Sequence, residues 1–324
     1  MRLLRPAGLL CAALLSAGPC KAAGAPHGRV HSAKVTVLST MLADNGELGE
    51  WGFSALVEAD GHRLLFDTGM HSDVVLKNAR GMEVDLGAVP EVILSHNHSD
   101  HVGGLLALRS AAMRRSPGAL GRAHVGLGIF YPRLGPIPGV EGNPMILIRP
   151  QYEATGGVFI EHGGPAELYP GVWITGPVPR RYPEHNWSGK GLVVTPAGTV
   201  EDNLPEDMSL VLDTDNGLIV VTGCGHAGIV NIVDYSRTVV RPARIHAIIG
   251  GVHLFDAPEP TVKWTADRLA ESGVDNFIGA HCTGIETVFS FRRYLSLDRA
   301  HAVVGAVGST FELGRGIDPG NIAR

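Results

Sequence analysis

The stretch that decides the fold is His96-Asn-His-Ser-Asp-His101, in which three histidines and one aspartate lie within six residues. It directly follows residues 92–95, Val-Ile-Leu-Ser, an apolar and β-branched run typical of a buried strand. Apolar residues at helical spacing come next, from Val102 to Met113. We therefore expect the histidines on a loop between a strand and a helix, where their side chains can converge on a ligand.

The spacing of these four side chains predicts a metal site. His96 and His98 are two apart on an extended segment, so their imidazoles project to the same side and can reach one ion. Asp100 and His101 follow the bend and are placed to reach a second ion. Nitrogen and oxygen ligands in this mixture suit zinc, with manganese or iron as alternatives. A purely structural role is a poor explanation, because burying four such groups without a ligand would cost several desolvation penalties.

Outward from this stretch, the unit of strand, histidine and helix recurs in the last third of the chain. Predicted strands at 218–222, 245–249 and 277–280 are followed by His226, His253 and His281 respectively. Further strands are predicted at 34–39, 53–57, 63–66 and 209–212, whereas residues 117–205 are rich in glycine and proline, with strands only near 172–175 and 192–195. No linker divides the chain. We predict one α/β domain over residues 26–324, with four layers in the order αββα.

The first 25 residues have the composition of a secretory signal peptide. Two arginines precede an apolar run at 7–17, and small residues follow at 23–25. The run is shorter than the ~20 apolar residues that span a bilayer. We expect a periplasmic or secreted protein with no stable membrane insertion after cleavage at residue 25. An uncleaved anchor, or a lipid anchor at Cys20, are the alternatives.

Charge and cysteine content restrict the partners and the redox chemistry. Loss of residues 1–25 removes three cations and no acids, which moves the formal net charge from −5 to −8. No basic run remains to bind phosphates, so a nucleic-acid partner is not expected. Only Cys224 and Cys282 remain, each beside a histidine motif. A disulfide between them is one option in an oxidising compartment, and the sequence leaves it open.

On these residues the chain resembles the metallo-β-lactamase superfamily. The superfamily's His-x-His-x-Asp-His signature after a strand is intact and is followed by Gly103 and Gly104. The segment Leu65-Phe-Asp67-Thr-Gly69 is similar to an upstream motif whose aspartate supports the metal loop from behind, and the resemblance implies that role for Asp67. The resemblance also implies the αββα sandwich of this superfamily and a centre with two zinc ions.

More narrowly, the chain is similar to the branch of dihydropterin ribofuranosyl-aminobenzene phosphate synthase-like metal-dependent hydrolases, over roughly residues 34–308. The motifs that carry this resemblance are Thr175-Gly-Pro-Val-Pro-Arg180, Thr222-Gly-Cys-Gly-His-Ala-Gly-Ile-Val-Asn231, Gly250-Gly-Val-His-Leu254 and His281-Cys-Thr-Gly284. The resemblance implies that His226 completes the first metal site with His96 and His98. It also implies that His281 completes the second with Asp100 and His101, and that Asp100 orients the nucleophile.

One departure from the superfamily pattern concerns the bridge between the ions. Many members use an aspartate there, but the matching segment at 248–253 reads Ile-Ile-Gly-Gly-Val-His. His253 is the nearest candidate, as a ligand or as a donor to substrate, and we assign it a catalytic role. Cys224 is the second candidate, with support of the ligands as its expected role. Without a bridging carboxylate the centre is net cationic, which favours an anionic small-molecule substrate.

The expected activity is hydrolysis of an ester, lactone or phosphodiester by a metal-bound hydroxide, because zinc lowers the pKa of bound water to ~7. Arg180 and His185, in the glycine- and proline-rich middle, are candidates for contacts with substrate. The alternatives are β-lactam hydrolysis and a non-catalytic metal-binding sensor. The synthase activity of the branch is not expected, because Trp51 and Pro177 stand where the branch has histidine and glutamate.

Overall fold

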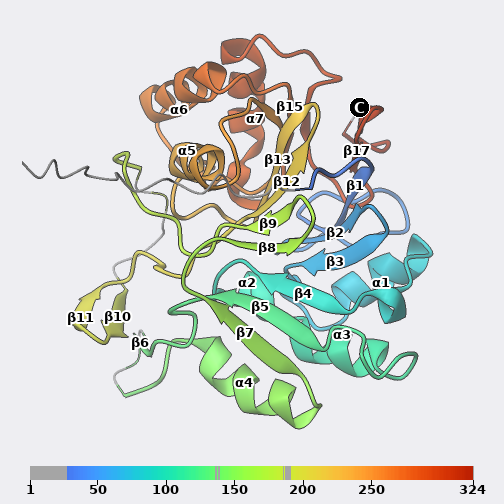
Figure 1. Ribbon diagram of the computed structural model, residues 1–324, viewed down its shortest axis with the longest axis vertical. Coiled ribbons are helices and arrows are strands. Elements are labelled where there is room, and N and C mark those ends of the chain that lie inside the picture. Colours follow the sequence, from blue (N-terminus) through green and yellow to red (C-terminus); the bar gives the residue numbers. More distant parts are fainter. Residues whose placement is uncertain (1–27, 136, 138, 185, 187–190, 324) are drawn as a thin grey trace, which may run out of the picture.

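Two large sheets form the centre of the computed structural model, which describes residues 28–323 apart from 136, 138, 185 and 187–190 (Figure 1). The first sheet has eight strands in the order β18-β17-β1-β2-β3-β4-β5-β7. In that order the strands are Gly316–Asp318, Thr310–Glu312, Ala33–Ser39, Ser54–Ala59, His62–Phe66, Glu91–Leu94, Arg122–Gly126 and Val158–His162. The predicted signal peptide lies outside the described residues.

The second sheet has seven strands in the order β16-β15-β14-β13-β12-β9-β8. They are Ala302–Val304, Asn276–Gly279, Ile245–Gly250, Gly217–Thr222, Leu210–Thr214, Val172–Ile174 and Ala166–Tyr169. A smaller sheet, at the left of Figure 1, has the order β11-β10-β6. Its strands are Gly198–Glu201, Leu192–Thr195 and Arg133–Leu134.

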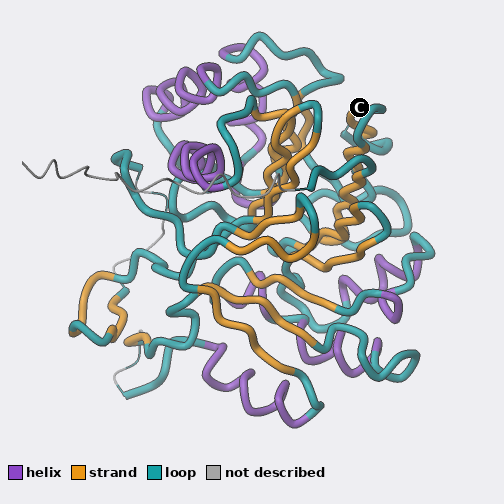
Figure 2. The backbone as a smooth tube through the Cα atoms, in the orientation of Figure 1, coloured by secondary structure: helices purple, strands orange, loops and turns teal. Residues whose placement is uncertain are grey.

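Helices cover the outer faces of both large sheets (Figure 2). The helices α1, α2, α3 and α4 are Val74–Gly81, Ser99–Val102, Leu105–Ala112 and Pro144–Ala154, and the short helix η1 is Leu86–Ala88. The helices α5, α6 and α7 are Ile229–Val239, Glu259–Glu271 and Ile285–Tyr294, and the short helix η2 is His281–Thr283. In the described part of the chain, none of them has the length and apolar character that a membrane span requires.

Three apolar clusters confirm the predicted αββα order of layers. The inner cluster joins the two large sheets, with Val57 of β2 and Val221 of β13 among its members. A second cluster lies between the seven-stranded sheet and α5, α6 and α7. A third lies between the eight-stranded sheet and α1, α3 and α4. Each sheet is therefore buried on both faces, which explains why its central strands read as continuous apolar runs.

Parallel pairing brings the predicted site residues to one edge of each sheet. Strands β13, β14 and β15 run parallel, so the segments that follow them meet at the same edge. These segments contain His226, His253 and His281. In the other sheet β3 and β4 are parallel, and they lead to Asp67 and His96. The antiparallel hairpin of β12 and β13 turns at Asp215 and Asn216.

The glycine- and proline-rich middle contains more regular structure than we predicted. Strands β5, β7 and β8 and helix α4 all lie there. Helix α4 has Pro150 in its interior and buries only Met145 and Tyr152, so it presents a weak helical pattern. The burial of β7 and β8 is partial, which blurs their alternation. Elsewhere the predicted strand ends differ from the observed ones by one or two residues.

Candidate metal centre

The structure brings the six predicted ligands together from three loops. The loop from β4 into α2 contributes four of them, the loop after β13 contributes His226, and η2 contributes His281. The ring centroids of His96 lie 4.6 Å from His98 and 4.7 Å from His226. Those of His98 and His226 are 5.0 Å apart. These three imidazoles form the first subsite.

The second subsite is formed by Asp100, His101 and His281. Asp100 Oδ2 lies 3.2 Å from His281 Nε2 and 3.7 Å from His101 Nε2. The two Nε2 atoms are 3.3 Å apart. Ligands about 2.0–2.1 Å from a tetrahedral zinc ion would be separated by about 3.4 Å. The spacing of these three atoms therefore fits one such ion.

Hydrogen bonds at the far side of three rings, those of His96, His101 and His226, leave their Nε2 atoms to face the centre. His101 Nδ1 lies 2.7 Å from Asp67 Oδ2, and a carboxylate only accepts, so Nδ1 carries the proton. Ser95 Oγ donates to Asp67 and therefore accepts from His96 Nδ1 at 2.9 Å. His226 Nδ1 donates to the carbonyl of Asn186. This arrangement is typical of histidines that bind a metal through Nε2.

Two of these Nε2 atoms are buried and, among the described residues, have no hydrogen-bond partner: those of His96 and His226. A buried acceptor without a partner is rare and calls for a ligand. The residues present therefore fit a divalent metal ion. Metal ligation by the six side chains remains a prediction.

Asp67 connects the two candidate subsites through hydrogen bonds. Its Oδ1 accepts from the backbone N–H of Ser95, and its Oδ2 accepts from the Ser95 hydroxyl, both at 2.7 Å. The same Oδ2 accepts from His101. Asp67 is fully buried and has a φ of 55°, a backbone conformation that costs of order 1–3 kcal/mol outside glycine. The carboxylate of this one residue thus orients a histidine in each subsite.

Burial and charge act differently on the two subsites. Burial lowers the pKa of His96 and His226 well below the ordinary value, and it lowers that of His98 to about 4. Burial also lowers the pKa of His101, but the carboxylates of Asp100 and Asp67 outweigh it and raise the value to about 9. The first subsite is therefore a neutral donor set, whereas the second contains anionic charge.

Comparison with known proteins agrees with this geometry. A family model described as the metallo-beta-lactamase superfamily matches residues 52–128. The chain is 28% identical to a solved metal-dependent hydrolase of the beta-lactamase superfamily, with a TM-score of 0.65, over 81% of this chain and 93% of that one. The chain therefore has the metallo-β-lactamase fold, and its residues 52–128 match the model of that superfamily.

Two proteins of Methanocaldococcus jannaschii are also similar to this chain. One is 7,8-dihydropterin-6-methyl-4-(beta-D-ribofuranosyl)-aminobenzene-5'-phosphate synthase, at 29% identity over 85% of this chain and 96% of the synthase. The other is an uncharacterised protein, at 26% identity over 73% of this chain and 85% of that protein. The similarity to the first agrees with the branch that the motifs indicate.

The two glycines after the superfamily signature allow the metal loop to pack against the segment after Asp67. A Cβ on Gly103 would lie 2.1 Å from the carbonyl oxygen of Met70, and one on Gly104 would lie 2.1 Å from that of Thr68. Real Cβ atoms do not approach so closely, so only glycine fits at either position. The short connection from the ligands into α3 depends on this contact.

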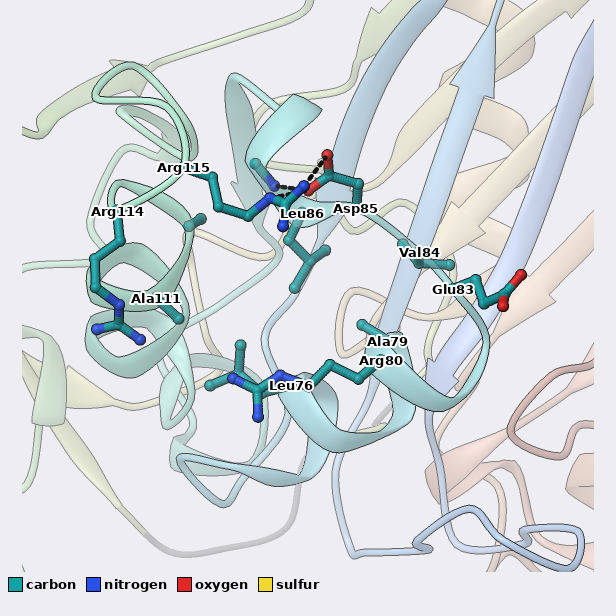
Figure 3. A pocket seen from close by; sticks show the side chains of 12 residues that line it. Leu76, Ala79, Arg80, Glu83, Val84, Asp85, Leu86, Ala111, Arg114 and Arg115 are labelled. Carbon is teal, nitrogen blue, oxygen red and sulfur yellow. Dashed lines mark hydrogen bonds and ion pairs between the residues drawn. The ribbon is translucent and has the colours of Figure 1, made fainter.

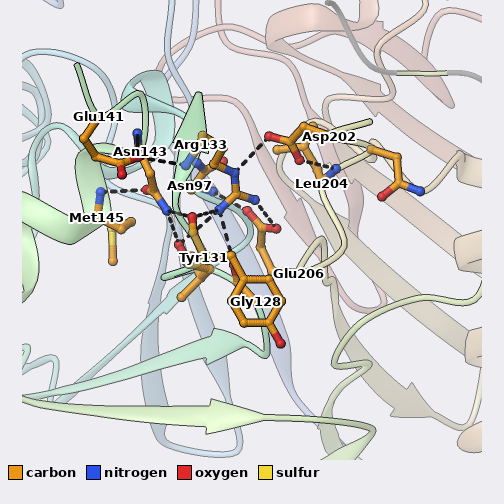
Figure 4. Close-up of polar contacts among 12 residues, drawn as sticks. Asn97, Gly128, Tyr131, Arg133, Glu141, Asn143, Met145, Asp202, Leu204 and Glu206 are labelled. Atoms are coloured by element: carbon orange, nitrogen blue, oxygen red, sulfur yellow. Dashed lines mark hydrogen bonds and ion pairs between the residues drawn. The ribbon is translucent and has the colours of Figure 1, made fainter. Parts of the chain in front are cut away.

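A buried ion-pair network supports the metal loop from the other side (Figure 4). Arg133 donates to Asp202 Oδ2 at 2.9 Å and to Glu206 Oε2 at 2.6 Å. Glu206 Oε1 accepts from the backbone N–H of Asn97, which lies between the first two ligands. Burial raises the pKa of Glu206 to about 7, with Arg133 opposing the shift. We did not identify this network from the sequence, because Arg133 and Glu206 lie in the weakly periodic middle.

The centre opens into a pocket of about 270 Å³. Its rim is apolar: Trp51, Phe255 and Met70 are 44%, 46% and 40% exposed. The rings of Trp51 and Phe255 meet edge to face at 5.7 Å, and Trp51 also contacts the ring of His281 at 5.1 Å. We did not predict this rim, because single apolar residues in separate loops show no pattern in the sequence.

His253 lies between this pocket and a neighbouring one of about 530 Å³, and it lines both. Its φ of 48° turns the chain at the end of β14, and its ring lies 4.6 Å from that of His226. The larger pocket is also lined by Glu184, Asn186, Asp256 and Trp264. His253 therefore borders the space open to a substrate, and its catalytic role remains a prediction.

The other predicted site residues have varied positions. Arg180 donates to the carbonyls of Leu204 and His226, at 3.3 and 3.4 Å, and so holds the loop of a predicted ligand. It does not line either pocket as described, and its contact with substrate remains a prediction. His185 lies outside the described residues. Cys224 and Cys282 are buried free thiols, so the structure contains no disulfide between them.

A separate hollow of about 390 Å³ lies between α1, η1 and α3 (Figure 3). Its charged lining includes Arg80, Arg114 and Arg115, together with Glu83 and Asp85. Arg115 pairs with Asp85 at 3.1 Å, and the arginines are exposed. None of the predicted metal ligands lines this hollow. It is a surface feature apart from the centre.

Proposed function

We propose that the chain is an exported hydrolase that holds two zinc ions and cleaves an ester, lactone or phosphodiester bond in a small molecule. The observation that carries the proposal is the convergence of six ligand side chains from two sheets, with three imidazoles oriented so that Nε2 faces the centre. Such ions, when bound, act as Lewis acids and supply a nucleophilic water near neutral pH.

Two side chains of the pocket would act on substrate and solvent. Asp100 lines the pocket, and its pKa lies below the usual range because the neighbouring His101 and His281 outweigh the effect of burial. It is therefore ionised, and it can accept a proton or a hydrogen bond from the nucleophile. His253 Nδ1 is buried and, within the described residues, has no hydrogen-bond partner. It would exchange a hydrogen bond with the leaving group.

The residues that line the two pockets favour a substrate with two parts: an anionic group that binds at the centre, and a neutral remainder. The residues described as lining the two pockets include no arginine or lysine, whereas Glu184 and Asp256 line the larger one. An anionic group is therefore expected to bind at the ions. The exposed rings of Trp51 and Phe255 offer an apolar surface to the rest of the molecule.

The similarity to a synthase favours a second candidate function within the same site. That relative matches 85% of the chain, so its reaction is a defined alternative to hydrolysis. Against it, the exposed Trp51 at the pocket rim stands where the branch has a histidine. Hydrolysis of β-lactams and a non-catalytic sensor role are the other two alternatives that an assay must distinguish from the proposed function.

The test begins with metal analysis of the purified protein. We expect about two zinc ions per chain. Ester, lactone, phosphodiester and β-lactam substrates are then screened with and without a chelator, with the synthase reaction as a separate arm. Turnover that disappears with chelator and in an Asp100→Asn variant supports the proposal. Equal turnover in that variant, or a protein without bound metal, contradicts it.

Export is tested separately from catalysis. The composition of residues 1–25 supports cleavage and release into an oxidising compartment. Expression of the full chain in a bacterium, followed by cell fractionation and N-terminal sequencing, should yield a periplasmic or secreted product that begins near residue 26. An intact N-terminus in the cytoplasm would overturn this part of the proposal.

A further inference from the structure

We infer that the Cys224 thiolate bridges the two metal ions, in the place where many members of the superfamily use an aspartate. The inference rests on the proposed function, since it assigns a ligand to the same two-ion centre. It differs from the six-ligand prediction, in which Cys224 only supports the ligands from behind.

Cys224 is the residue that both ligand groups have in common. The ligand atoms of Asp100, His101, Cys224 and His281 all lie within 4.8 Å of one another. Those of His96, Cys224 and His226 are equally close to one another. Cys224 Sγ also lies 3.1 Å from His101 Nε2, close enough for both atoms to contact one ion. One sulfur atom is therefore within reach of both subsites.

The backbone leaves no room for an aspartate at the end of β14. A Cβ on Gly250 would lie 1.9 Å from the carbonyl oxygen of Thr222. A Cβ on Gly251 would lie 2.3 Å from that of Gly223 and 2.8 Å from Cys282 Sγ. The loop that contains Cys224 thus packs directly on the segment where the bridging residue is otherwise found. The sulfur reaches the centre from the neighbouring strand instead.

The chemistry of a thiolate suits this position. Cys224 is buried, with only 2% of its surface exposed, so its sulfur is shielded from solvent at the centre. A divalent ion deprotonates a coordinating thiol, and zinc accepts sulfur readily. The resulting anion supplies the negative charge that the missing carboxylate would have provided. The centre stays net cationic, because Asp100 is the other anionic ligand.

Two neighbours are weaker candidates for the bridge. The ligand atoms of His253, Cys224 and Cys282 lie within 4.8 Å of one another. Among the described residues, His253 does not belong to either of the two clusters that contain the predicted ligands. Cys282 Sγ faces the carbonyl oxygen of Cys224 at 3.8 Å. In the described part of the chain, its sulfur clusters with the ligand atoms of Cys224 and His253 and with no others. Cys282 is equally buried, so Cys282→Ser is the matched control for Cys224→Ser.

The test is zinc-edge X-ray absorption on the full chain loaded with zinc, because the signal counts sulfur neighbours and does not depend on activity. Zinc–sulfur contacts lie at about 2.3 Å and are distinct from zinc–nitrogen and zinc–oxygen contacts. A thiolate that bridges both ions gives each zinc one sulfur neighbour. A thiolate bound to one ion alone gives an average of half a sulfur per zinc, and a thiol that binds neither ion gives none. We expect one sulfur per zinc.

Variants and a second metal complete the design. The sulfur contact should be lost in Cys224→Ser and kept in Cys282→Ser. Cobalt-loaded wild type should show a thiolate-to-cobalt charge-transfer absorption with the same dependence on Cys224. Two bound ions with half a sulfur or none, or a contact that persists in Cys224→Ser, overturns the bridge and leaves the proposed function intact. A protein that binds no ions overturns both. The wild-type spectra decide the question even where a variant fails to fold.

Discussion

The ligand loop at 96–101 and the later ligands His226 and His281 are held in different ways. The loop is supported by acidic side chains: Asp67 binds His101 directly and His96 through Ser95, and Glu206 binds the backbone of Asn97. The later ligands are held through backbone groups. The ring of His226 donates to a carbonyl, and the N–H of His281 donates to Thr40 Oγ1 at 3.0 Å.

This difference indicates how damage would spread through the centre. The loop contributes to both subsites, so loss of one of its acidic supports affects two ions. Each later ligand belongs to one subsite and has its own contacts, so its loss should affect one ion. The acidic supports are also buried, where an unpaired partner is costly. The following variants test the contrast.

Substitution of Asp67→Ala should have the largest effect on metal binding. It removes the acceptor for His101 Nδ1 and for the Ser95 hydroxyl that orients His96, so both subsites lose an oriented ligand. Loss of such a support weakens metal affinity by about 10- to 100-fold. We expect metal content after dialysis to fall toward zero, measured by elemental analysis. Asp73→Ala, at an exposed i,i+4 pair, is the control and should retain both ions. Retention of two ions in the Asp67 variant would contradict the shared support.

His226→Ala and His281→Ala should each remove about half of the bound metal. His226 belongs to the first subsite and His281 to the second, and each carries a single predicted ligand atom. Titration of each metal-free variant with zinc, followed by calorimetry, should show one strong site in place of two. Loss of both ions in either variant would mean that the subsites do not bind independently.

Arg133→Met should lower the free energy of unfolding, and its effect on the bound metal should be smaller than that of Asp67→Ala. The guanidinium and its partner Glu206 are buried, and removal of one member of a buried ion pair costs about 3–5 kcal/mol. Denaturant unfolding measures the change in free energy. Arg115→Met breaks the exposed pair with Asp85 and should cost less than about 1 kcal/mol. Equal losses in the two variants would show that the network does not support the loop.

Glu184→Gln should change the pH dependence of stability, as the smallest of these effects. Burial raises the pKa of Glu184 to about 7, against the lowering influence of N–H groups of Asn231 and Val230 at the start of α5. A raised carboxyl pKa contributes stability below about pH 4.5 that is lost as pH rises through about 7. Between about pH 4.5 and 7, the free energy of unfolding of the metal-free wild type should therefore fall by up to about 3 kcal/mol more than that of the variant. Denaturant unfolding across that pH range measures the difference, and parallel profiles would exclude it.

The sequence by itself predicted most of the fold and named the six candidate ligands that the structure brings together. The strands after which the histidines fall are continuous apolar runs, and His96 to His101 are contiguous, so local pattern and spacing were sufficient for these four candidates. The resemblance supplied His226 and His281. The layer order followed from the repeated units of strand and helix and from the superfamily motifs. Helix α4 escaped prediction, because Pro150 and weak burial hide its periodicity.

Only the tertiary structure decided how the centre is supported and which residue lies between the two subsites. The contacts of Arg133 with Glu206, and of Cys224 with His101, join residues far apart in the chain, and no local pattern encodes such distances. The exclusion of a side chain at Gly250 likewise depends on the carbonyl of Thr222 on the neighbouring strand. Spacing along the chain specifies which groups share a loop, whereas the packing of the sheets determines which loops meet.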